Sequence, residues 1–166
     1  TIYNKNLKAL ILESSTPGIE ETQLQLERIN NDKLLAKKIK DEGVEKFFEF
    51  WYNIPLFQSL KLQNEIVLSN LIKKRTNNSV IGLSNMMVGF SQGYMSSKWK
   101  ILTNINTKTL LLSGSLDTKF TNINIQMNEL LKYSTFLIIE NAGHIPHLEN
   151  PSLFENYLLN FLETIK

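Results

Sequence analysis

The sequence lacks cysteine altogether and has only two histidines among its 166 residues. Without cysteine the chain can form neither disulfides nor thiolate metal sites, and two histidines argue against a histidine-rich metal centre. The formal net charge of +2 is too small to indicate nucleic acid or an anionic membrane as a partner. No apolar run is long enough to span a bilayer. A content of 42% hydrophobic and 20% charged residues is typical of a soluble globular domain, for which we expect a cytoplasmic location.

The amino terminus carries no recognisable targeting signal. Thr1–Asn6 has no apolar h-region, so we do not expect it to be a secretory signal peptide. The sequence also starts with threonine instead of methionine, which favours a fragment or a processed chain.

Three short apolar runs near the two ends of the chain predict buried strands. These strands are expected at Leu7–Leu12, Thr109–Leu112 and Phe136–Ile139. Apolar residues with helical spacing predict helices at Glu20–Glu42, Val44–Tyr52, Leu62–Lys74, Val80–Val88, Ile123–Lys132 and Leu153–Ile165. Gly43 is expected to end the first of these helices.

The chain ends in the order strand, helix, strand, helix. This order implies an α/β fold with parallel strands and right-handed crossovers. Three parallel strands make a poor free-standing sheet, because such a sheet needs both faces covered and would leave one open edge. We therefore expect the chain to be the C-terminal part of a larger domain. A small complete domain is the alternative.

Two loops that follow predicted strands contain the residues with the clearest chemistry. The loop Ser113–Phe120 contains Asp117, and the loop Asn141–Pro151 contains His144. An aspartate after one strand and a histidine after the next is how α/β-hydrolases supply the acid and the base of a catalytic triad. Asp117 could instead cap a helix, and His144 could be a structural loop residue. Their combination favours the triad, whereas His147 is interpreted as structural.

A candidate nucleophile occurs at Gly89-Phe90-Ser91-Gln92-Gly93, which matches the pattern G-x-S-x-G. The order Ser91, Asp117, His144 is that of an α/β-hydrolase. However, a nucleophile elbow needs a buried strand before it, and the residues before Gly89 continue a helical pattern. Ser91 is therefore not favoured as the nucleophile, and the sequence contains no convincing alternative.

Several segments resemble one enzyme family, that of 2-succinyl-6-hydroxy-2,4-cyclohexadiene-1-carboxylate synthase in menaquinone biosynthesis. The segments that carry the resemblance are Leu10–Ile19, Leu26-Glu27-Arg28, Phe50-Trp51-Tyr52, Ile54-Pro55-Leu56-Phe57, Gly114–Phe120 and Gly143-His144. The resemblance implies the C-terminal part of an α/β-hydrolase fold with a helical cap insertion. Residues 1–19 and 104–166 would form parts of the core, and residues 20–103 would form the cap.

The resemblance also implies roles for individual residues. Asp117 matches the triad acid and His144 the triad base, while Arg28, Trp51 and Arg75 match substrate-binding positions of the cap. The family's nucleophile lies in a Gly-Tyr-Ser-x-Gly-Gly-Arg elbow before the first strand seen here, in a segment that this sequence does not contain. No metal and no organic cofactor are implied.

The function implied by the resemblance is that of a carbon–oxygen lyase. It eliminates pyruvate from a succinyl-cyclohexene carboxylate, and we expect this chain to be inactive without the missing N-terminal segment of the same fold. A serine hydrolase with esterase-like activity is one alternative. A non-catalytic fragment or binding module is the other.

Overall fold

The computed structural model describes residues 6–62 and 65–165, which form two compact units. The sheet unit comprises Thr1–Pro17 and Trp99–Lys166, and the helical unit comprises Gly18–Lys98. Apart from Asn6, the amino-terminal stretch considered for a signal peptide lies outside the described residues. The division into core and cap remains a prediction, and each unit is described by itself below.

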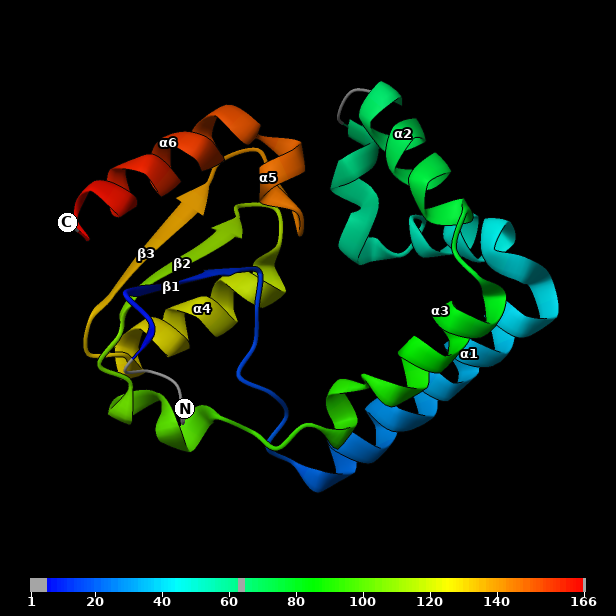
Figure 1. Ribbon diagram of the computed structural model, residues 1–166, viewed down its shortest axis with the longest axis horizontal. Helices are drawn as coiled ribbons and strands as arrows, with labels where there is room; N and C mark the ends of the chain where they lie inside the picture. Colours follow the sequence, from blue (N-terminus) through cyan, green and yellow to red (C-terminus); the bar gives the residue numbers. More distant parts are fainter. Residues whose placement is uncertain (1–5, 63–64, 166) are drawn as a thin grey trace. The chain divides into compact units, whose positions relative to one another are not determined.

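The sheet unit contains a parallel sheet whose strands lie in the order β1-β2-β3 (Figure 1). The strands are β1 (Ala9–Glu13), β2 (Lys108–Gly114) and β3 (Ser134–Ile139). In register, Leu110 of the central strand stands beside Ile11 of β1 and Thr135 of β3. All three predicted strands are therefore confirmed, and their carboxyl ends meet at one edge of the sheet.

Helices cover both faces of this sheet because the central strand is apolar on both sides. Leu111 packs with Met127 of α4 (Thr118–Leu130), whereas Leu110 and Leu112 pack with Phe161 of α6 (Pro151–Glu163). These three leucines are fully buried. Figure 1 shows α4 and α6 on opposite sides of the strands. Burial on both faces is what a continuous apolar run in a parallel sheet predicts.

The helical unit is built on one long, interrupted helix. Helix α1 (Thr22–Trp51) contains Gly43 with φ 85° and ψ 168°, so two helices meet at this glycine. A positive φ suits glycine, which has no side chain to clash. The predicted break at Gly43 is therefore confirmed. The other elements of this unit are η2 (Pro55–Leu62), α2 (Glu65–Thr76), α3 (Val80–Gly89) and η3 (Gln92–Tyr94).

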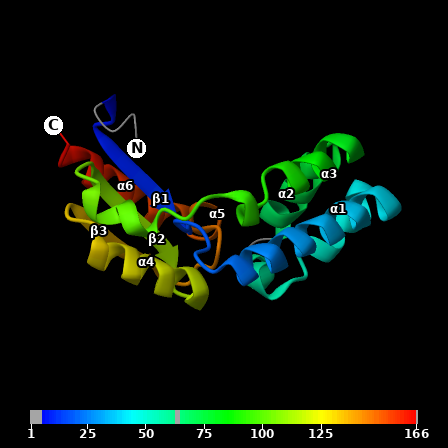
Figure 2. The same ribbon diagram turned by 90° about the horizontal axis from the view of Figure 1, so that it is seen from below.

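Two contacts organise the helical unit. Helices α1 and α3 lie side by side in both views (Figures 1 and 2). Beyond the kink, four aromatic residues from α1, its C-cap and η2 pack together, with ring centroids at most 5.9 Å apart between neighbours: Phe47, Phe48, Tyr52 and Phe57. The aromatic-rich segment therefore forms the apolar centre of this unit.

The structure corrects several predicted boundaries. Helix α4 begins at Thr118, whereas the pattern predicted Ile123, because the Asp117 side chain accepts a hydrogen bond from the Phe120 amide and caps the helix. The predicted start of α2 at Leu62 borders positions 63–64, which lie outside the described residues. The short elements η2, η3, η4 (Trp99–Asn104) and α5 (Pro146–Glu149) were not predicted. Over the described residues, no helix is long and apolar enough to cross a membrane.

Tyr52 provides a test of the aromatic cluster. Its side chain is buried, and its hydroxyl has no hydrogen-bond partner among the described residues. Burial raises the pKa of Tyr52 above its usual value, and the nearby positive charge of Arg75 opposes this rise. The folded chain therefore keeps the Tyr52 proton more tightly than the unfolded chain does. The stability that results is present below about pH 10 and is lost as the pH rises through the folded pKa.

We predict that Tyr52→Phe preserves the free energy of unfolding at neutral pH, because the removed hydroxyl makes no bond with the described residues. Above about pH 10 the variant should lose less stability than the parent chain. Urea denaturation at several pH values measures both effects, with Tyr94→Phe as the control because Tyr94 is exposed. Parallel pH profiles for Tyr52→Phe and the parent would contradict the prediction.

Candidate active site

The loops after β2 and β3 are joined by hydrogen bonds at the carboxyl edge of the sheet. The Ser115 amide donates to the Ile139 carbonyl at 3.0 Å, and the Leu116 amide donates to the Ala142 carbonyl at 2.9 Å. In return, the Asn141 amide donates to the Ser115 hydroxyl at 3.0 Å. Asn141 has φ 59°, a left-handed conformation that asparagine tolerates better than most residues. These bonds hold the two loops against each other.

Gly114 allows these loops to approach so closely. A β-carbon at this position would lie 2.1 Å from the Ala142 carbonyl oxygen and 2.2 Å from that of Gly143. No side chain fits into that space, so the end of β2 touches the main chain immediately before His144. The glycine therefore determines how near the His144 loop lies to Asp117.

Asp117 and His144 meet in this arrangement. Asp117 Oδ2 lies 2.7 Å from His144 Nδ1, and Oδ1 accepts the Phe120 amide at 3.2 Å. A carboxylate only accepts hydrogen bonds, so we assign the proton to Nδ1. Asp117 is 6% exposed, and the Phe120 ring lies 4.5 Å from the imidazole, centroid to centroid. Asp117 thus caps a helix and orients His144 at the same time, which is the geometry of a triad acid and base.

Ser91 lies in a different context, in the helical unit. It follows helix α3, it is 2% exposed, and its hydroxyl accepts a hydrogen bond from the Gly93 amide at 3.2 Å. A β-carbon on Gly93 would lie 2.4 Å from the Gln25 carbonyl oxygen, so this glycine permits η3 to pack on α1. The G-x-S-x-G match therefore belongs to a capped turn and lacks the strand that a nucleophile elbow requires.

The same turn helps to hold Arg28. Arg28 Nε donates to Asp32 Oδ2 at 2.8 Å, and its Nη1 donates to Gln92 Oε1 at 3.0 Å. The Asp32 side chain is 4% exposed and that of Arg28 is 38% exposed. Two partners thus orient the guanidinium while part of it remains open to solvent. Sequence reasoning missed both partners, although the spacing of Arg28 and Asp32 by one helical turn could have indicated that pair.

Arg28 and Trp51 line one cavity of the helical unit, with a volume of about 350 Å³. Its other lining residues are Asp32, Met86, Met87 and Phe90. Trp51 also stacks on Phe47, with centroids 5.6 Å apart. A guanidinium beside an aromatic and thioether wall can hold a carboxylate attached to an apolar ring.

Arg75 and His147 lie elsewhere. The Arg75 guanidinium lies 5.9 Å from the centre of the Phe48 ring and does not line the cavity of Arg28 and Trp51. The structure therefore does not bring the third predicted substrate residue to that cavity. His147 Nδ1 lies 2.9 Å from the Glu13 carboxylate, and its amide donates to Glu13 Oε1. These bonds tie β1 to α5, as expected of a structural histidine.

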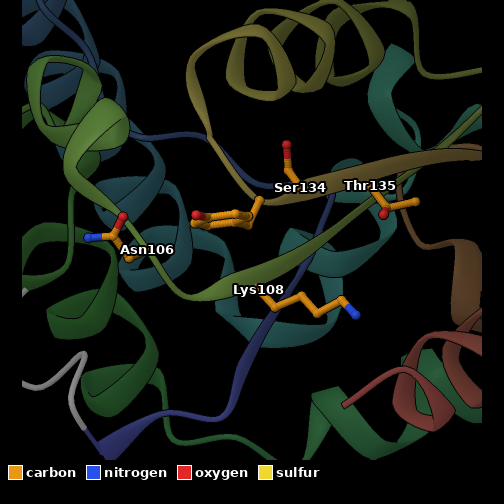
Figure 3. Close-up of a pocket in the computed structure, with 5 residues that line it drawn as sticks. Asn106, Lys108, Ser134 and Thr135 are labelled. Atoms are coloured by element: carbon orange, nitrogen blue, oxygen red, sulfur yellow. The ribbon is translucent and has the colours of Figure 1, made fainter.

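A second cavity, of about 470 Å³, lies at the amino ends of β2 and β3, away from Asp117 and His144. Figure 3 shows that its labelled side chains point in different directions instead of converging. Lys108 Nζ donates to the Thr164 carbonyl and the Ser134 hydroxyl donates to Asn128 Oδ1, each at 2.8 Å. Two of its polar groups are thus already bonded to protein atoms. Over the part of the chain that the structure describes, no group of three or more acidic or histidine side chains could hold a metal.

Comparisons with known proteins identify the relatives of this chain. No protein-family model matches it. It is 37% identical over 163 residues to a Bacillus subtilis protein assigned by name as a 2-succinyl-6-hydroxy-2,4-cyclohexadiene-1-carboxylate synthase, covering 98% of this chain and 60% of that protein. The synthase of Salmonella typhi is 29% identical over 88% of this chain and 55% of its own length.

Solved structures agree with the sequence matches. MenH from S. aureus superimposes with a TM-score of 0.94 and 32% identity, over 98% of this chain and 63% of that one. A thermophilic esterase from Thermogutta terrifontis superimposes with a TM-score of 0.82 and 20% identity, over 98% of this chain and 58% of that one. At this identity the esterase shows only that the fold is shared.

The sheet and its covering helices, together with these solved structures, identify the fold as part of an α/β-hydrolase fold. Within it, the chain is homologous to part of the 2-succinyl-6-hydroxy-2,4-cyclohexadiene-1-carboxylate synthases. The predicted fold class and the family resemblance are thereby confirmed. The chain spans only part of the length of these relatives: 60% of the Bacillus subtilis protein and 55% of the Salmonella typhi synthase.

The close contact at Gly114 leads to a prediction. Gly114→Ala should lower the free energy of unfolding by about 3 kcal/mol, because a methyl group cannot enter the space beside the Ala142 and Gly143 carbonyls. It should also break the hydrogen bond between Asp117 and His144. Chemical denaturation and the imidazole NMR signals measure these effects.

Gly89→Ala is the matched control, since a β-carbon at Gly89 meets nothing within 4 Å. Its effect on stability should stay within about 1 kcal/mol. A Gly114→Ala variant as stable as this control would contradict the close approach.

Proposed function

We propose that this chain supplies the acid, the base and the substrate-binding residues of an α/β-hydrolase-fold lyase. The reaction is elimination of pyruvate from a succinyl-cyclohexene carboxylate. The observation that carries the proposal is the 2.7 Å contact of Asp117 Oδ2 with His144 Nδ1 at the strand ends. The similarity to the synthases over 98% of the chain supports the choice of reaction.

In this proposal Asp117 keeps His144 in the tautomer that leaves Nε2 as a proton acceptor. The triad removes a proton from a ring carbon of the substrate. The electron pair left behind forms a carbon–carbon double bond, and the carbon–oxygen bond to the departing group breaks. That oxygen takes the bonding electrons, so the group departs as the enolate of pyruvate. Protonation of this enolate on carbon then gives pyruvate.

The serine of the triad comes from a segment of the same fold outside these 166 residues. The elbow Gly-Tyr-Ser-x-Gly-Gly-Arg has no counterpart in this sequence. Among the described strands, β1 pairs only with β2, so its other edge has backbone groups that can accept a further strand. Without that segment the chain would be inactive.

Substrate binding is proposed for Arg28, Trp51 and Arg75. A guanidinium binds a carboxylate through two parallel hydrogen bonds, which lysine cannot reproduce. The cavity beside Arg28 and Trp51 supports this assignment for two of the three residues. For Arg75 the support is the family resemblance. A cytoplasmic location remains a prediction from the sequence.

The test is a chimera. The chain covers 60% of the Bacillus subtilis relative, and the uncovered part, which we expect to be amino-terminal, is fused before Thr1. We predict pyruvate release from the succinyl-cyclohexene carboxylate by the chimera and none by the chain alone. Asp117→Asn should lower kcat by about 10⁴, because the imidazole then adopts the wrong tautomer. His144→Ala should have an effect of similar size.

Asp41→Asn is the matched control, since Asp41 lies on the exposed surface of α1 and pairs only with Lys37 among the described residues. It should retain the activity of the unsubstituted chimera. Cleavage of simple nitrophenyl esters without pyruvate release would favour a serine hydrolase. A folded chimera with neither activity would favour a non-catalytic role.

A further inference from the structure

Glu149 is a buried carboxylate that the proposed chemistry does not use. It is the last residue of α5, it is 5% exposed, and no ion pair reaches it within the described residues. Its Oε2 accepts the Gly143 amide at 2.8 Å, and its Oε1 accepts the Ile145 amide at 3.0 Å. Each oxygen thus binds a different main-chain amide.

These two amides belong to the residues immediately before and after His144. One carboxylate therefore holds the main chain on both sides of the histidine. Burying a carboxylate is costly unless hydrogen bonds compensate, so the two bonds account for its presence in this position. Ile145 is also the N-cap residue of α5, so the bond from its amide anchors the start of this short helix.

A second carboxylate contacts the same loop but holds it less firmly. Glu13 accepts the His147 amide and contacts the His147 ring. The side chains of Glu13 and His147 are 23% and 46% exposed, so water competes for this pair. Glu149 differs in being buried and in contacting the peptide groups next to His144.

We propose that Glu149 is the positioning residue of His144. It holds the main chain of residues 143–145 so that the imidazole meets Asp117 in a single orientation. The effect of Glu149 on catalysis rests on the proposed function. The positioning itself is a property of this chain and can be measured without any substrate.

The first experiment uses NMR of the chain with ¹⁵N-labelled histidine. Only two histidines are present, so the spectrum contains His144 and an internal reference, His147. In the parent chain His144 should show one fixed tautomer with the proton on Nδ1. In Glu149→Gln, which can accept only one of the two amides, the His144 nitrogen signals should move toward the average of both tautomers. The His147 signals should stay unchanged.

Amide hydrogen exchange gives a second readout of the same variant. Exchange at Gly143 and Ile145 should become at least about tenfold faster, because the bonds from these amides are lost or weakened. Glu155→Gln is the matched control, since it makes the same change at an exposed position of α6. It should leave both readouts as they are in the parent chain.

Glu149→Asp covers the case in which Glu149→Gln does not fold. It keeps the charge but withdraws the carboxylate by one methylene, so it cannot span both amides. The folded aspartate variant should show the same mixing of His144 tautomers. A folded variant of either kind with an unchanged His144 spectrum and unchanged exchange at Gly143 and Ile145 would overturn the proposal.

Kinetics of the chimera separate this proposal from the proposed function. Glu149→Gln in an active chimera should lower kcat by about 10- to 100-fold with little change in KM, since the base is misplaced but the substrate residues are not. An equal kcat would overturn the positioning role. An inactive chimera would contradict the proposed function, while the NMR result would still decide the role of Glu149.

Discussion

The close packing of Gly114 against the main chain of Ala142 and Gly143 is the constraint on which the candidate site depends. Parallel strands bring their carboxyl ends to one edge, but they leave the loops beyond that edge free to diverge. Here the loops after β2 and β3 are in backbone contact and share three hydrogen bonds. The close packing and two of the three bonds involve only peptide groups, so they constrain the main chain next to His144 independently of the bonds of its side chain.

Buried carboxylates restrain candidate residues within each unit, and each carboxylate acts on a different group. Asp117 binds the imidazole of His144 and caps α4 with its other oxygen. Glu149 binds the amides on both sides of that histidine. In the helical unit, Asp32 holds the guanidinium of Arg28 in the same way that Asp117 holds a ring. A buried acid beside His144 and another beside Arg28 reduce the freedom of these two side chains, so less entropy would be lost if they bound a ligand.

The spacing of apolar residues predicted those elements that are long enough for the spacing to repeat. The three strands, the break at Gly43 and the closing helix α6 belong to this class. It failed for η2, η3, η4 and α5, because these helices have at most eight residues, too few to show a period. The start of α4 was missed for another reason. Its first turn contains Thr118 and Thr121, which are poor helix formers, and the cap at Asp117 compensates for them.

The sequence by itself determined the α/β class and the parallel order of the C-terminal strands, and it predicted Asp117 and His144 as an acid and a base in the loops after neighbouring strands. These features depend on local patterns and on residue type. Tertiary structure alone decided that Ser91 caps a turn and that Arg75 lies against Phe48 instead of lining the cavity of Arg28. It also decided that Glu149 accepts hydrogen bonds from the main chain next to His144. Such contacts depend on which surfaces of the folded chain pack together, and a local sequence pattern does not predict that packing.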